Sequence, residues 1–171
     1  DFGALASRLA DSLGSSADRT VAALMIGSSL RHWSAPLADS SRDYNDAYSI
    51  GLESGNLQYA AYAFGHNMYC RFWQGTQLDQ LLSEIAGYLA FSENRKNRWA
   101  IDLLEGGKLV ASTLVGRTHD NTLFALPNLD EATYLERCRQ NANTQVLCIY
   151  AILKSEALYI LDELDLARKA S

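Results

Sequence analysis

Apolar residues recur at helical spacing along most of the chain. In residues 78–91, the apolar positions are Leu78, Leu81, Leu82, Ile85 and Leu89, which places them on one face of a helix. Similar patterns predict helices over 2–13, 18–33, 36–54, 57–73, 99–114, 128–141 and 144–161, with a further helix beginning at 164–169. No strand pattern of useful length occurs, so the hydrophobic pattern predicts an all-α fold.

The connections between these segments are short, which predicts that successive helices are antiparallel neighbours. The clearest turn is Ser54-Gly55-Asn56. Gly55 can adopt positive φ, and Asn56 is a favourable N-cap for the returning helix. Residues 115–127 lack helical periodicity and are predicted to form a loop. The Gly106-Gly107 pair predicts a kink or a close helix approach, since each glycine costs about 1 kcal/mol relative to alanine.

Two segments indicate an internal repeat. Residues 55–60 match the turn and small-residue part of a tetratricopeptide repeat, and residues 162–167 have the same form. Tyr48 stands where Gly or Ala is usual, and the helix spacing exceeds the period of about 34 residues. We therefore expect degenerate repeats: antiparallel helix hairpins stacked as a tetratricopeptide-like α-α superhelix of about seven to eight helices, in a single domain over residues 1–171.

Composition narrows the class of protein. The 171 residues include two prolines and carry a net charge of −5, which favours long helices and disfavours nucleic acid as a partner. No apolar run reaches the roughly 18 residues of a membrane span. Three cysteines without a CxxC pair predict reduced, buried thiols in a cytoplasmic protein. The chain lacks an initiator Met and ends on the start of a helix, so we expect a piece of a much longer polypeptide.

No pattern predicts a catalytic residue, a cofactor or a metal site. Gly106-Gly107-Lys108 lacks the glycine spacing and the hydroxyl residue of a phosphate-binding loop. His66 and Cys70 could share a helix face, but no second ligand pair accompanies them. His32 is followed by Trp33 instead of the acidic residue typical of a phosphoacceptor histidine. A GxSxG nucleophile elbow is absent from the sequence.

Aromatic residues supply the candidate binding surface. Tyr62, Tyr69 and Trp73 fall at i, i+7 and i+11 and form a second stripe on the predicted helix 57–73. Tyr and Trp are favoured in binding surfaces, so this stripe is a candidate partner or ligand surface. The alternative is that these side chains belong to the core between helices.

Several short segments of the sequence resemble one protein family. They are RHWSAPL (31–37), GLESGNLQYAAYAF (51–64), Gly75 with Leu78, LVGRT (114–118), DEATYL (130–135) and YILDELDLA (159–167). They resemble a helical region of large microbial signalling proteins that carry a predicted signal-transduction ATPase. That region lies between the ATPase and output domains such as GAF with histidine kinase or nucleotide cyclase, and many of these proteins begin with a serine/threonine-kinase-like domain. The resemblance implies a tetratricopeptide-like scaffold whose ATP-binding and phosphotransfer residues lie elsewhere.

Two functions remain open at this point. The first is a non-catalytic scaffold or regulatory module that contacts neighbouring domains of the same polypeptide or a protein partner, with a homodimer as one arrangement. The alternative is a small-molecule sensing domain that binds an apolar ligand among its aromatic residues.

Overall fold

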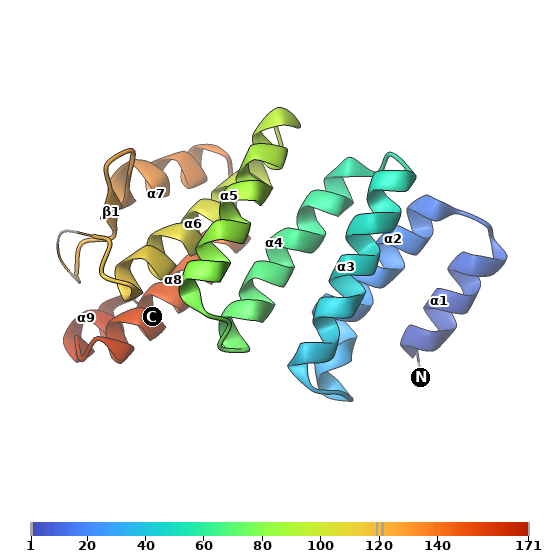
Figure 1. The fold of residues 1–171 in the computed structure, drawn as a ribbon, viewed down its shortest axis with the longest axis horizontal. Helices are drawn as coiled ribbons and strands as arrows, with labels where there is room; N and C mark the ends of the chain where they lie inside the picture. The colour runs from blue at the N-terminus through green and yellow to red at the C-terminus, as the bar shows by residue number, and fades with distance from the viewer. Residues whose placement is uncertain (1, 119, 121, 171) are drawn as a thin grey trace. The chain divides into compact units, whose positions relative to one another are not determined.

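The computed structural model describes residues 2–118, 120 and 122–170. Within these residues it contains nine α-helices and one small two-stranded sheet (Figure 1). The α-helices are α1 (Phe2–Ser12), α2 (Ser16–Met25), α3 (Leu37–Glu53), α4 (Leu57–Trp73), α5 (Leu78–Asn94), α6 (Arg98–Leu114), α7 (Glu131–Gln140), α8 (Thr144–Ile160) and α9 (Leu164–Ala170). The predicted all-α fold is confirmed, with more helices than the seven to eight expected.

The loop predicted over residues 115–127 contains the first strand of that sheet. β1 (Ala125–Leu126) pairs antiparallel with β2 (Leu129–Asp130), with Leu126 opposite Leu129. The strands are too short to give a periodic signal, so the hydrophobic pattern missed them. Asp130 then caps α7, because its carboxylate accepts a hydrogen bond from the Thr133 backbone amide at 2.9 Å.

Contacts between residues divide the chain into two compact units, Asp1–Thr76 and Gln77–Ser171. The first unit contains α1 to α4, and the second contains α5 to α9 with the small sheet. Each unit has its own buried residues. A single domain over residues 1–171 stays a prediction.

Helices α2 to α6 follow one repeat spacing across both units. The interval from the start of α3 at Leu37 to the start of α5 at Leu78 equals the interval from the start of α4 at Leu57 to that of α6 at Arg98. All four helices contain 17 residues. The same interval separates the starts of α2 and α4. A tetratricopeptide period of about 34 residues would place the start after Leu37 at Arg71, inside α4, so this repeat is longer.

The last hairpin keeps the same internal spacing. The start of α9 at Leu164 follows the start of α8 at Thr144 by a fixed number of residues. The start of α4 at Leu57 follows the start of α3 at Leu37 by the same number. α8 would be the first helix of the hairpin that follows α5 and α6. It begins later in the chain than one repeat interval after the start of α5. The extra residues accommodate the loop, the β-hairpin and α7. The C-terminal echo noted in the sequence is thus a hairpin of the same register.

In the first unit, the helix predicted over 18–33 is interrupted. Regular α-helix ends at Met25 and continues as a π-helical turn, η1 (Ile26–Leu30), and a 3₁₀ turn, η2 (Arg31–Trp33). Gly27 lies within the π-helical turn, and a Cβ there would lie 3.0 Å from the Cβ of Asp43 and 3.1 Å from Cε1 of Tyr44. The absent side chain allows α3 to approach this turn closely.

The turn at Gly55 has the predicted geometry. Gly55 has φ = +74° between α3 and α4, and Asn56 occupies the N-cap position of α4. The Asn56 side chain makes no capping hydrogen bond. Behind the turn, Gly51 of α3 faces Ala60 of α4, where an added Cβ would lie 2.9 Å from the Ala60 Cβ.

In the second unit, α6 is continuous through Gly106 and Gly107, so the glycine pair marks a close approach and not a kink. A Cβ at Gly106 would overlap the hydroxyl of Tyr134 and lie 3.2 Å from Cδ2 of Tyr150. Buried Asp102 of α6 accepts hydrogen bonds from Arg137 Nε at 2.9 Å and Asn143 Nδ2 at 2.6 Å. These contacts hold α7 and the start of α8 against α6.

Among the described residues, the helices are all too short or too polar to cross a membrane.

Candidate functional site

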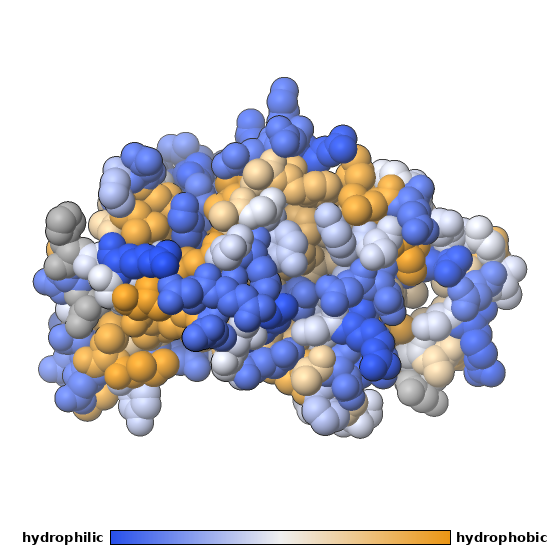
Figure 2. Space-filling model, in the orientation of Figure 1, coloured by the Kyte–Doolittle hydropathy of each residue, from blue (hydrophilic) through white to orange (hydrophobic). Residues whose placement is uncertain are grey.

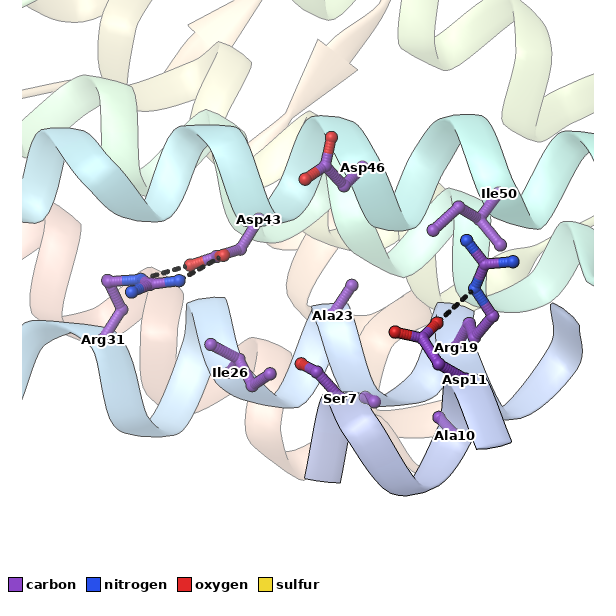
Figure 3. Close-up of a pocket in the computed structure, with 11 residues that line it drawn as sticks. Ser7, Ala10, Asp11, Arg19, Ala23, Ile26, Arg31, Asp43, Asp46 and Ile50 are labelled. Atoms are coloured by element: carbon purple, nitrogen blue, oxygen red, sulfur yellow. Dashed lines mark hydrogen bonds and ion pairs between the residues drawn. The ribbon is translucent and has the colours of Figure 1, made fainter. Parts of the chain in front are cut away.

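A charged cleft lies between α1, α2 and α3 in the first unit (Figure 3). Its volume is about 370 Å³. It is lined by Ser7, Ala10 and Asp11 of α1, by Arg19, Ala22 and Ala23 of α2, by Ile26 and Arg31 of the two short turns, and by Asp43, Asp46 and Ile50 of α3. The α3 residues fall at i, i+3 and i+7, so one helix face supplies all of them.

An ion pair between Arg31 and Asp43 closes one end of the cleft. Arg31 Nε and Nη2 donate to the two carboxylate oxygens of Asp43, each at 2.7 Å. The Asp43 side chain is 11% exposed and that of Arg31 is 37% exposed. The hydrogen bond from Arg31 to Asp43 raises the pKa of Arg31 above its usual value. A bidentate pair fixes the geometry of both groups.

The π-helical turn positions this arginine. Arg31 follows η1 directly, and the wider turn changes the direction in which it leaves the helix. π-Helical turns occur frequently at functional sites, where they displace a side chain from the regular helical register. The sequence gives no signal for this turn, so Arg31 and Asp43 could not be paired from helical periodicity.

The remaining charges of the cleft are more exposed. Arg19 Nε lies 3.1 Å from Asp11 Oδ1, and both side chains are about half exposed or more. Solvent screens such a pair strongly. Asp46 is exposed and makes no hydrogen bond or ion pair with another residue that the structure describes. Three aspartates and two arginines leave a net negative charge at neutral pH.

The three aromatic residues of the candidate surface lie on α4, outside the cleft lining. Tyr69 is 4% exposed and its ring lies 6.0 Å from that of Trp73, which is 45% exposed. Tyr62 is half-buried, and its hydroxyl accepts a hydrogen bond from Gln58 Nε2 at 2.6 Å. Their role as a partner or ligand surface stays a prediction, as does an apolar ligand among them.

The cysteines differ in their surroundings. Cys70 and Cys138 are buried, whereas Cys148 on α8 is exposed, so the prediction of buried thiols is wrong for Cys148. Burial raises the pKa of Cys138 to about 11. The His66–Cys70 pair gains no third ligand: no group of three or more His, Cys, Asp or Glu side chains suited to a metal ion occurs in the described part of the chain.

The recurring register of helices α2 to α6 and of the α8–α9 hairpin defines the chain as an all-α helical-repeat protein. No family model, curated protein or solved structure matches it.

Proposed function

We propose that this chain is a non-catalytic helical-repeat scaffold or regulatory module that acts through protein–protein or interdomain contacts. The cleft between α1, α2 and α3 carries the proposal, because consecutive hairpins form it and it is lined by charged groups. Helical-repeat proteins bind partners along surfaces that their stacked units create.

The wider context rests on the resemblance of the sequence. It supports a place in a cytoplasmic, multidomain signalling protein with a signal-transduction ATPase and a sensor-kinase or regulator output. In that context the repeat hairpins would contact neighbouring domains, and the chemistry of ATP would lie outside these residues.

The charges of the cleft favour a cationic group of the partner. Asp43 is already saturated by Arg31, and Asp11 is paired with Arg19. Asp46 is the carboxylate that remains for a ligand. A lysine or arginine side chain could pair with it while its aliphatic stem lies against Ile50 and Ile26.

Binding of short peptides to the purified chain tests this proposal. We expect peptides with a central Lys or Arg to bind, and the matched norleucine or citrulline peptides to bind weakly. Asp46→Asn should weaken Lys or Arg binding at least about tenfold, since charge-assisted hydrogen bonds contribute roughly 1.5–3 kcal/mol. Glu53→Gln removes the same charge from α3 outside the cleft and should leave binding unchanged. Equal effects of the two substitutions, or no preference for a cation, would reject the site.

A further inference from the structure

Two exposed apolar surfaces lie in the part of the chain that the structure describes. The first, the α1 stripe, consists of Phe2, Leu5, Leu9 and Leu13, whose exposure ranges from 53% at Leu5 to 84% at Phe2. The second, the α8–α9 groove, has a volume of about 590 Å³ and is lined by Ile152, Ser155, Tyr159, Leu164 and Ala167, together with the charged residues Glu156 and Arg168. Figure 2 shows hydrophobic residues gathered over the α8–α9 hairpin, at the lower left. Patches of this kind mark interaction surfaces.

The repeat register shows which residues of α3 occupy the same positions as the residues of the α1 stripe. Positions are counted from the residue with positive φ in each turn, Gly14 for α1–α2 and Gly55 for α3–α4. Leu5 lies nine residues before Gly14, as Asp46 lies nine before Gly55, and Leu9 corresponds in the same way to Ile50. Asp46 and Ile50 line the cleft against α1 and α2. The α1 stripe is therefore the face by which a repeat meets the hairpin before it.

The same count shows which positions of the α1–α2 hairpin correspond to the α8–α9 groove. Ser155 and Tyr159 lie seven and three residues before Asp162, the positive-φ residue of that turn. Ser7 and Asp11 lie seven and three residues before Gly14 and line the cleft that faces α3. The groove is therefore the face by which a hairpin receives the first helix of another repeat.

We propose that α1 of a second copy of this chain docks in the α8–α9 groove, in the position that α3 holds beside the α1–α2 hairpin, where it packs chiefly against α2. The polarity of the residues selects this occupant. α3 brings Asp46 to a charged cleft, whereas α1 brings Leu5 at the same register, and the groove offers Ile152 and Leu164. The contact joins two different surfaces, so it is heterologous, and a dimer held by one such contact keeps a free stripe and a free groove.

Sedimentation velocity of the full chain across a concentration series tests this assembly. We expect concentration-dependent species larger than a dimer. Leu9→Glu in the stripe and Leu164→Glu in the groove should each weaken association at least about tenfold, because each buries a charge in an apolar contact. Leu123→Glu changes an exposed leucine outside both surfaces and should have no effect.

Mixing the two variants separates a head-to-tail contact from a symmetric one. The Leu9→Glu chain keeps its groove and the Leu164→Glu chain keeps its stripe, so an equimolar mixture should form dimers and nothing larger. Far-ultraviolet circular dichroism of each variant must retain the helical signal for the comparison to hold. A chain that stays monomeric at the highest concentration, or a mixture that forms no dimer, overturns the proposal.

Discussion

Five turns between helices of the same unit each contain one residue in the left-handed backbone region. They are Gly14, Gly55, Lys96, Ala142 and Asp162, with φ between +53° and +74°. Three of them are not glycine, although a side chain in this region costs about 1–2 kcal/mol. The conformation is therefore set by the packing of the two helices, and the residue at the turn adapts to it.

Substitution of Gly55 measures this backbone cost directly. A Cβ at Gly55 would have no heavy atom within 4 Å, so the effect of a side chain there is one of backbone conformation alone. We expect Gly55→Val to lower the free energy of unfolding by about 1–2 kcal/mol, and Gly55→Asn to lower it less, because Asn tolerates this region. Urea denaturation provides the measurement. An unchanged stability of the Val variant would contradict the turn assignment.

His66 makes the stability of the first unit depend on pH. Burial lowers its pKa below the ordinary value of 6.5. Above pH 6.5 the side chain is neutral in both states, whereas below it the unfolded chain binds a proton more readily. Stability should therefore fall as the pH decreases from 6.5 through the folded-state pKa.

His66→Gln should remove this part of the pH dependence. Urea unfolding of both proteins at a series of pH values between neutral and mildly acidic gives the difference in slope. His32→Gln, at an exposed histidine, is the matched control. The assignment is wrong if His66→Gln retains the full slope.

At the scale of elements, helix positions were predictable where one face is apolar, as in α5 and α6. The end of the regular helix at Met25 was not predictable. It accompanies a close approach of Tyr44 of α3 to Gly27, and a contact between two helices leaves no mark in the periodicity of either. The glycine pair of α6 indicated a close approach in the sequence, but the sequence did not show that Tyr134 is the residue that approaches Gly106. The cleft was missed because its ion pair joins Arg31, displaced by the π-helical turn, to a carboxylate on another helix.

The close approach at α6 predicts opposite effects for two glycine substitutions. Gly106→Ala places a Cβ against fully buried Tyr134, so we expect a loss of about 1–3 kcal/mol in stability. Gly87→Ala on α5 meets no atom within 4 Å and should gain up to about 1 kcal/mol from helix propensity. Thermal and urea unfolding measure both. A stabilised Gly106→Ala variant would refute the tight contact.

At the scale of the whole molecule, the recurring register of the hairpins indicates that stability is distributed over them. Each hairpin contacts mainly its sequence neighbours in such architectures. The buried residues of the first unit include Leu24, Tyr44 and Ala63, and those of the second include Tyr134 and Tyr150. Each unit thus has a core of its own.

Separate cores predict that the two units fold independently. We expect the fragments 1–76 and 77–171, expressed separately, each to have helical circular dichroism and a cooperative urea transition. A control cut between residues 96 and 97 separates α5 from α6 and exposes buried Leu103 and Val110, so the fragment 97–171 should lose cooperativity. If fragment 1–76 or 77–171 is unfolded in isolation while the intact chain is stable, folding requires both units, and a single domain over residues 1–171 becomes the better description.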